Sequence, residues 1–181
     1  MDLSWRYDFW WSHLPASPKD VGALRGIVLR TPGAGTGARE IVESVKVSVT
    51  GGLEGDRWSV DEQRTEADQV ALINVHVLGS VAGDDPERRA LSGDNLHVDL
   101  DLTEANLPVG TRLAIGSAIL EVSPQAHQPC GKFHDRYGVS AVKKVLRANR
   151  KGRRGRGVLC LVRRDGELRV GDEIRVERPD R

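Results

Sequence analysis

Short apolar segments rich in valine, leucine and isoleucine recur along most of this chain, separated by turns that contain glycine, proline or aspartate. In one of them, Val45, Val47 and Val49 alternate with polar residues, which is the two-residue period of a half-buried strand. Many short strands with few helices favour a β-barrel or a β-sandwich. The strand-like segments are 24–31, 42–50, 69–73, 95–100, 111–115, 118–122, 158–162 and 173–177.

Two stretches depart from the strand pattern and predict helices. Asn74 can cap a short helix over 75–81, and a longer helix with apolar residues on one face is expected over about 140–149. The glycine-rich run at 32–37 predicts a hairpin loop, because it lacks the Gly-Lys-Ser/Thr ending of a phosphate-binding loop and the helix that follows one. The expected fold class is mainly β, a β-rich α+β protein with a few short helices.

The N-terminal region is unusually aromatic, since five of the eight aromatic residues fall within the first eleven positions. Two prolines follow, so we expect residues 1–23 to form an arm attached to a single domain over 24–181. Such an arm packs on its own domain or forms an interface with another molecule. The sequence favours packing on the domain and leaves open a homo-oligomer through the arm.

Cysteine content and the N-terminal sequence bear on the compartment of the protein. Two cysteines in 181 residues do not form a disulfide framework, so a reducing compartment is expected. The N-terminus has no continuous apolar stretch, and no segment has the length and hydropathy of a membrane span. We therefore expect a cytoplasmic protein with no membrane partner.

The two cysteines have different surroundings in the sequence. Cys160 lies in an apolar run of buried-strand length, where a free cysteine behaves as a small hydrophobic residue. Cys130 lies between Pro129 and Gly131, so proline restricts the backbone and glycine leaves the thiol unscreened. The thiolate is the nucleophile and the soft metal ligand, and Lys132 nearby would stabilise it. Cys130 is therefore the candidate reactive group.

The net charge is only +1, but positive charge is concentrated in one region. From Arg136 to Arg164 there are eleven Lys or Arg residues and no Asp or Glu, and eight of them lie within 143–156. Such a segment is a solvated basic surface or contacts an anionic ligand. No aromatic residue interrupts 143–156 and no nucleic-acid-binding motif accompanies it, so we do not expect a nucleic-acid partner.

Six motifs follow one another along the chain: Gly-Leu-Glu-Gly-Asp-Arg at 52–57, Asp-Gln-Val-Ala-Leu-Ile at 68–73, Gly-Asp-Asn-Leu at 93–96, Val-Gly-Thr-Arg-Leu-Ala-Ile-Gly at 109–116, Pro-Cys-Gly-Lys at 129–132, and Arg-Gly-Val-Leu-Cys-Leu-Val to Val-Gly-Asp-Glu-Ile across 156–174. Their order and spacing resemble the MOSC domain, the C-terminal domain family of molybdenum cofactor sulfurases. The resemblance covers about residues 24–177 and is to a stand-alone member of the family.

The resemblance implies a β-barrel akin to the barrel domain of pyruvate kinase. It also implies a molybdenum cofactor (molybdopterin) held by Cys130, which is then both the catalytic residue and the metal ligand. No pyridoxal phosphate is expected, because the chain has no room for a sulfurase domain. The family pattern often has His, Arg, and Arg or Glu at the positions that are Trp58, Asp68 and Asp94 here.

Within the motifs that carry the resemblance, several residues suit a phosphorylated pterin. Gln69 and Asn95 offer donors and acceptors to a pterin edge, and Arg57 and Arg154 offer forked donors to a phosphate. Lys132, beside the thiol, completes the predicted cofactor-binding set. The alternatives stay open: a turn cap for Asn95, a solvent-facing strand position for Gln69 and a surface charge for Arg57.

The resemblance favours an enzyme, a molybdenum cofactor-dependent reductase of small N-hydroxylated or similarly oxidised substrates. Its electrons would come from a separate donor protein, because the chain has no ferredoxin, flavin or haem motif. The first alternative is a sulfur carrier, in which Cys130 accepts sulfur from a cysteine desulfurase as a persulfide and delivers it to a metal–sulfur cofactor. The second is a non-catalytic binding module.

Overall fold

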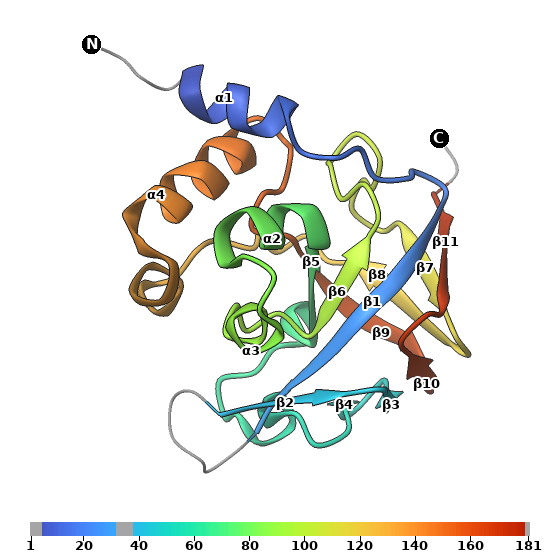
Figure 1. Cartoon of the computed structure of the whole chain (residues 1–181). Helices are drawn as coiled ribbons and strands as arrows, with labels where there is room; N and C mark the ends of the chain where they lie inside the picture. Colours follow the sequence, from blue (N-terminus) through green and yellow to red (C-terminus); the bar gives the residue numbers. More distant parts are fainter. Residues whose placement is uncertain (1–4, 32–37, 180–181) are drawn as a thin grey trace.

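The computed structural model of the chain describes residues 5–31 and 38–179. Within this part of the chain, a ring of strands closes into a seven-stranded barrel (Figure 1). β5 and β6 pair in parallel, and the other neighbours in the ring are antiparallel. The closed barrel confirms the predicted fold class. In ring order the strands are β1 (Val21–Arg30), β11 (Glu173–Glu177), β7 (Arg112–Ile115), β8 (Ala118–Val122), β9 (Val158–Arg164), β5 (Val70–Asn74) and β6 (Leu96–Asp99).

Four further strands lie outside the ring. β2 (Arg39–Val42) pairs antiparallel with the end of β1, and β10 (Gly166–Arg169), β3 (Ser44–Ser48) and β4 (Gly52–Leu53) form a second sheet. The predicted strand over 42–50 therefore includes β3, which belongs to the second sheet rather than to the barrel. The glycine-rich run at 32–37 lies outside the described residues.

The helices gather on one side of the barrel (Figure 1). They are α1 (Trp5–Ser12), α2 (Val75–Ala82), α3 (Pro86–Ala90) and α4 (Gly131–Arg150), and two 3-10 turns, η1 (Arg57–Val60) and η2 (Glu66–Asp68), follow β4. The cap predicted at Asn74 is confirmed, since its side chain accepts hydrogen bonds from the His76 and Val77 amides of α2. Among the described helices, none has both the length and the hydropathy required to cross a bilayer.

Helix α4 starts nine residues before the predicted position 140, directly after Cys130. Gly138 interrupts it with φ 80° and ψ 172°, a backbone conformation that glycine adopts without a Cβ clash. Phe133 is 1% exposed and packs edge-to-face on Tyr137 at 4.9 Å, so burial of this pair stabilises the unpredicted first segment.

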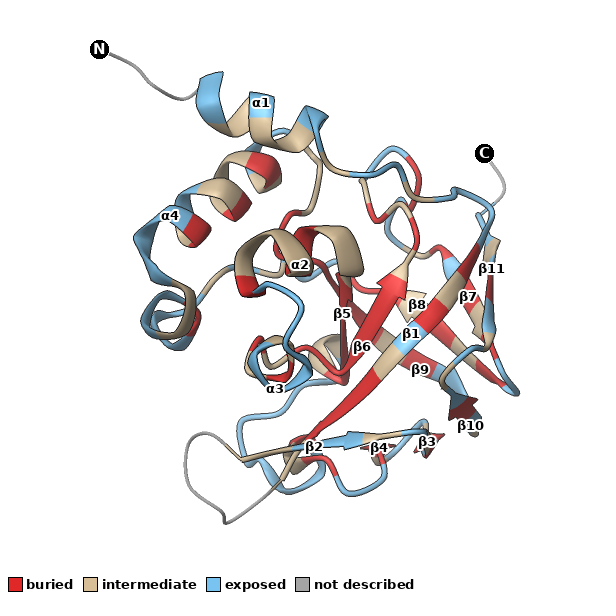
Figure 2. Ribbon diagram, viewed as in Figure 1, coloured by how far each residue is buried: buried red, intermediate tan, exposed pale blue. Residues whose placement is uncertain are grey.

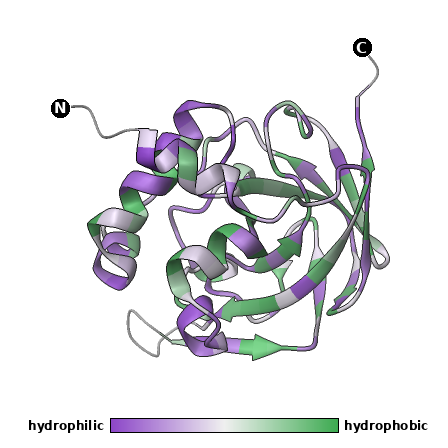
Figure 3. Cartoon of the chain, turned by 45° about the horizontal axis from the view of Figure 1, so that its top comes forward, coloured by the Kyte–Doolittle hydropathy of each residue, from purple (hydrophilic) through white to green (hydrophobic). Residues whose placement is uncertain are grey.

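The main apolar core fills the barrel. Figure 2 shows buried residues concentrated on the strands, and in Figure 3 hydrophobic residues follow the same strands. Leu24, Leu72 and Leu120 are fully buried there, as is Cys160. Burial raises the pKa of the Cys160 thiol to about 12, so this group is neutral and structural, as the sequence predicts.

The described part of the N-terminal arm packs on the chain itself. Trp10 and Trp11 join an apolar cluster that includes Phe133 of α4. Asp8 lies within 2.8–3.2 Å of Arg147, Lys151 and Arg153, which join α1 to the basic segment. Part of the predicted basic patch is therefore neutralised within the chain.

Candidate functional site

Cys130 lines a cleft of about 300 Å³ that lies near the last residue of β1 and the first residue of β2. The lining also includes His127, Trp58 and Gly93. Among the described residues, seven Lys or Arg side chains but only Asp61 and Asp68 line the cleft, so it is strongly basic. The seven cations are Arg30, Arg39, Arg57, Arg64, Lys132, Arg136 and Arg156.

Cys130 is placed by the start of α4. It is the N-cap residue, and its carbonyl accepts the amides of Phe133 at 3.0 Å and His134 at 3.2 Å. Its side chain makes no capping hydrogen bond and remains exposed. Because the buried Phe133 fixes the first turn, the thiol is held at the rim of the cleft while staying accessible.

One wall of the cleft is a cluster of guanidinium groups around Arg39. Burial, followed by repulsion from Arg136, Arg57 and Arg30, lowers the pKa of Arg39 to about 10. Its Nη1 donates to the Ala38 carbonyl, whereas its buried Nε has no hydrogen-bond partner within the described residues. A buried donor without a partner among repelling cations indicates a place for an anion.

Gly93 allows close approach to this wall. A Cβ at Gly93 would lie 3.4 Å from Arg39 Nη2 and 3.9 Å from Arg136 Nη1, and its φ of +82° is unfavourable for other residues. Arg136 also donates to the Leu91 carbonyl at 2.7 Å. The Gly93 backbone therefore leaves space beside two guanidinium groups.

Arg156, which lines the cleft, forms a buried ion pair with Asp94 behind it. Both carboxylate oxygens of Asp94 lie 2.6 Å from Arg156 Nη1, and both side chains are almost completely buried. Burial alone would raise the pKa of Asp94, but Arg156 and then His127 outweigh it, and the pKa falls below its usual value. His127 Nδ1 lies 3.6 Å from Asp94, while burial and then Arg156 lower its pKa to about 3, so the imidazole is neutral.

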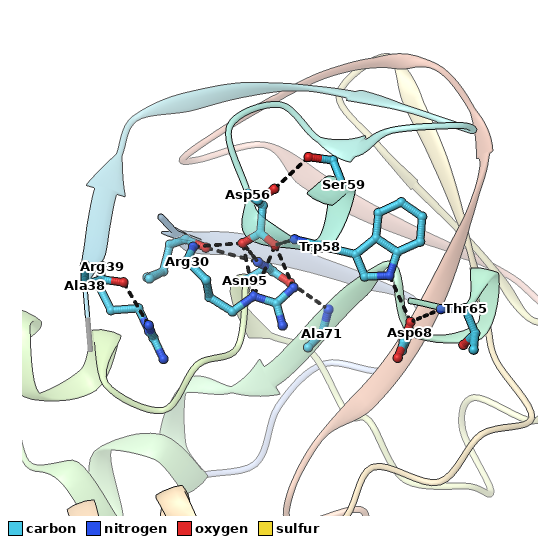
Figure 4. Close-up of polar contacts among 11 residues, drawn as sticks. Arg30, Ala38, Arg39, Asp56, Trp58, Ser59, Thr65, Asp68, Ala71 and Asn95 are labelled. Carbon is cyan, nitrogen blue, oxygen red and sulfur yellow. Dashed lines mark hydrogen bonds and ion pairs between the residues drawn. The ribbon is translucent and has the colours of Figure 1, made fainter. Parts of the chain in front are cut away.

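A second polar network, centred on Asp56, joins the end of β1 to η1 and to the residue before β6 (Figure 4). Asp56 accepts hydrogen bonds from Arg30 Nη2 at 2.7 Å, the Trp58 amide at 2.9 Å and Asn95 Nδ2 at 2.9 Å. Burial would raise the pKa of Asp56, yet these contacts, with Arg30 first, lower it. Asp56 therefore has a structural role, and it also caps η1.

The structure brings Arg57 and Lys132 together with Cys130, since all three line the cleft. It does not bring Gln69 and Asn95 there. Gln69 Oε1 accepts the Val162 amide at 2.7 Å, and its Nε2 donates to the Val49 carbonyl. Gln69 is therefore buried between strands rather than solvent-facing.

Asn95 is fully buried and bonds inside the barrel wall. Its Oδ1 accepts a hydrogen bond from the Ala71 amide and its Nδ2 donates to Asp56 (Figure 4). The same Nδ2 also donates to the Val28 carbonyl. Arg154 lines a different cavity, and its Nη1 donates to the Leu107 carbonyl at 2.7 Å. The geometry thus gives no support to the predicted cofactor-binding roles of Gln69, Asn95 and Arg154, because backbone groups elsewhere hold their side chains.

Trp58 and Asp68, two residues that depart from the family pattern, contact each other. Trp58 Nε1 donates to Asp68 Oδ1 at 2.9 Å, and the same oxygen accepts the Thr65 amide at 3.1 Å (Figure 4). Arg64 lies over the Trp58 ring at 5.6 Å. Trp58 and Asp68 therefore form one hydrogen-bonded unit that closes the 57–68 loop along the cleft.

The comparisons with known proteins agree with this geometry. The family model of the MOSC domain matches residues 80–175, more than half of the chain. The chain belongs to the MOSC domain family. This family is generally associated with binding of the molybdenum cofactor. A comparison with curated protein sequences finds no match.

Several solved structures resemble this MOSC protein in fold. YuaD from Bacillus subtilis aligns over 88% of this chain and 97% of its own, with a TM-score of 0.64 and 20% identity. YiiM from Escherichia coli aligns over 87% and 71%, with a TM-score of 0.55 and 23% identity. YiiM from Geobacillus stearothermophilus aligns over 86% and 74%, with a TM-score of 0.60 and 19% identity. At these identities the likeness concerns the fold alone.

Arg39, Arg136 and His127 line the MOSC cleft but were not part of the predicted cofactor-binding set. Arg39 follows the glycine-rich run in the sequence and has no motif of its own, and Arg136 belongs to the unpredicted half of α4. His127, three residues before Cys130, was distinguishable only by proximity to the thiol. Within the described residues, no group of three or more His, Cys, Asp or Glu side chains could hold a metal ion.

Proposed function

We propose that this protein binds a molybdenum cofactor in the Cys130 cleft and reduces small N-hydroxylated or similarly oxidised substrates. The observation that carries the proposal is an exposed thiol at the rim of a cleft whose described lining includes seven cations and two carboxylates. A thiolate is a soft ligand suited to a transition metal, and guanidinium groups suit a phosphorylated pterin. The two requirements of the cofactor meet in one place.

The fit rests on buried guanidinium nitrogens that have no hydrogen-bond partner in the part of the chain that the structure describes. Arg39 Nε and Arg156 Nε are buried without hydrogen-bond partners among the described residues, and both side chains line the cleft. Arg39 and Arg57 would hold the phosphate, while Cys130 would hold the metal. Arg30 and Arg156 are already paired with carboxylates, so they shape the wall rather than supply free charge.

When bound, the cofactor supplies a metal that changes oxidation state by two electrons. The chain contributes the rest of the site. Cys130 would hold the metal at the rim, where an exposed position lets a substrate and a separate electron-donor protein approach. Lys132, the second residue of α4, adds a positive charge to the cleft that Cys130 lines. The neutral His127 offers hydrogen bonds at the floor without adding positive charge.

The exposure of Cys130 also favours a second candidate, a sulfur carrier. In that reaction the Cys130 thiolate attacks the outer sulfur of a desulfurase persulfide, which forms a Cys130 persulfide and releases the desulfurase thiolate. The basic cleft would stabilise the persulfide anion. A mass increment of a single sulfur atom on Cys130, after incubation with a cysteine desulfurase and cysteine, is the signature of this reaction.

The two candidates separate in one set of assays. Protein from a host that makes the cofactor is tested for reduction of an aromatic amidoxime with a reduced dye as electron donor, beside the persulfide assay. The reductase proposal predicts turnover that Cys130→Ser abolishes. Turnover that is absent from cofactor-loaded protein, together with persulfide formation on Cys130, would favour the carrier.

Arg39→Gln tests the phosphate-binding wall. It should weaken retention of the cofactor about tenfold or more during dialysis, because it removes a charge-assisted contact. Arg25→Gln is the matched control, since the Arg25 side chain is 58% exposed and does not line the cleft. Equal retention by both variants would contradict the assigned role of Arg39.

A further inference from the structure

A second cavity of about 430 Å³ adjoins the Cys130 cleft. Gln125, His127 and Leu159 line both spaces, so one wall of side chains separates them. The volume lies within the range of small-molecule sites in proteins. A molecule in this second cavity would therefore lie beside whatever Cys130 holds.

The lining of the second cavity differs chemically from that of the cleft. Val122, Val158 and Leu159, all almost completely buried, form an apolar floor at the ends of β8 and β9. In the described lining, Glu104 and Arg154 are the charged side chains, one of each sign, and His127 is neutral. The cavity carries almost no net charge, whereas the adjoining cleft is strongly basic.

The walls are held in place by hydrogen bonds. Asn149 Nδ2 donates to the His127 carbonyl at 3.0 Å and to Gln128 Oε1 at 3.3 Å. The Ser123 amide donates to the Leu159 carbonyl at 2.9 Å. The cavity is thus preformed, which lowers the cost of ligand binding.

Arg154 occupies a strained position in this wall. Its φ of +50° makes it the one non-glycine residue with a positive φ among the described residues. Its Nη1 reaches the Leu107 carbonyl, so the side chain braces the loop beside the cavity. Strain of this kind persists where the surrounding structure fixes the backbone.

We infer that the second cavity binds an uncharged aromatic or heteroaromatic molecule with an amide-like edge. Its apolar floor suits a flat ring, and the amides of Gln125 and Gln128 suit a donor–acceptor edge. A ligand with a net charge of either sign would find no excess of the opposite charge in this cavity. That this molecule is the substrate rests on the proposed function, whereas the site itself rests on geometry.

The test uses the metal-free full chain, with valine methyl groups labelled for NMR, and three probes of similar shape. Benzamide is neutral, benzoate is anionic and benzamidine is cationic. We expect benzamide to shift the methyl signals of Val109, Val122 and Val158 saturably, while benzoate and benzamidine leave these signals unchanged. Because no metal is present, failed molybdenum uptake leaves this result intact, and failed benzamide binding leaves the cofactor proposal intact.

Val109→Trp should fill the mouth of the cavity and weaken benzamide binding about tenfold or more. Val109 is 53% exposed, so the larger side chain does not disturb the core. Val139→Trp is the matched control, with 56% exposure and a position on α4 outside the cavity, and it should bind benzamide as the wild type does. Absence of saturable shifts, equal binding of the three probes at these methyl groups, or unchanged affinity in Val109→Trp would overturn the inference.

Discussion

The buried Asp94–Arg156 pair makes a sharp prediction for the variant Asp94→Asn. Asp94 is 0% exposed, and both its oxygens lie 2.6 Å from Arg156 Nη1. Asparagine retains the shape but removes the negative charge, so Arg156 becomes an unpaired buried cation. Breaking a buried ion pair from one side costs about 3–5 kcal/mol. At roughly 2–4 °C per kcal/mol for a domain of this size, the midpoint temperature should fall by about 6–20 °C.

The pH dependence of Asp94→Asn provides an independent check. Because the folded-state pKa of Asp94 lies below its ordinary value, its stabilising contribution is complete above the unfolded pKa of about 4. That contribution is lost as pH falls through the lower, folded pKa. The free energy of unfolding of the wild type should therefore decline below about pH 4. In the Asn variant this decline should be less steep, by up to about 1.4 kcal/mol per pH unit.

Urea unfolding followed by circular dichroism measures both effects. Asp135→Asn is the control, because the Asp135 side chain is 77% exposed and should change stability by less than about 0.5 kcal/mol. The double variant Asp94→Leu/Arg156→Met should recover most of the loss, since it removes both buried charges. A loss below about 1 kcal/mol in Asp94→Asn, or an unchanged pH slope, would refute this reasoning.

Three further predictions concern other contacts. Trp58→Phe removes the donor to Asp68 and should lower the free energy of unfolding by about 2 kcal/mol; an unchanged urea midpoint would contradict the contact. Asp8→Asn should speed proteolysis of the N-terminal arm, and equal cleavage rates in the variant and the wild type would argue against the anchor. Because Arg147 and Lys151 depress the pKa of Asp8, the wild type should begin to lose the same anchor as pH falls below the ordinary pKa of an aspartate. Iodoacetamide should modify Cys130 in the native protein but Cys160 only after unfolding, which peptide mass spectrometry would detect, and native labelling of Cys160 would disprove its burial.

The strands of the barrel were predictable because each one carries its own apolar pattern. The fold class and most barrel strands follow from those patterns, with shifts of a few residues at the ends. The first half of α4 was not predictable, because glycines at both ends weaken its local helix signal. Its stability comes from burial of Phe133 against residues distant in sequence, which periodicity does not report.

The candidate site was predictable only in part. Cys130 is distinguished by its local sequence, and Arg57 and Lys132 do line the same cleft. Gln69 and Asn95 are polar residues in strand segments, and the sequence does not reveal that their amides satisfy backbone groups inside the barrel wall. Partners of this kind are fixed by strand register, which only the folded structure provides.

The fold also shows where the positive charge of the chain gathers. Asp8 neutralises part of the 143–156 segment, whereas the cleft gathers cations from separate elements, among them Arg39 of β2 and Arg136 of α4. A count of charges along the sequence includes Arg136 and Arg156 but does not reveal that they meet Arg30, Arg39 and Arg57 in one cleft. The cations that line the Cys130 cleft come together only in the folded structure.

The most direct test of the central claim is the molybdenum and pterin content of purified protein. Wild type and Cys160→Ser from a cofactor-producing host should contain both in stoichiometric amounts, while Cys130→Ser should lose the metal. The Cys160→Ser control separates loss of a metal ligand from loss of a thiol. Metal-free wild-type protein that takes up no supplied cofactor, or equal molybdenum in Cys130→Ser, would contradict the assignment of Cys130 as the metal ligand.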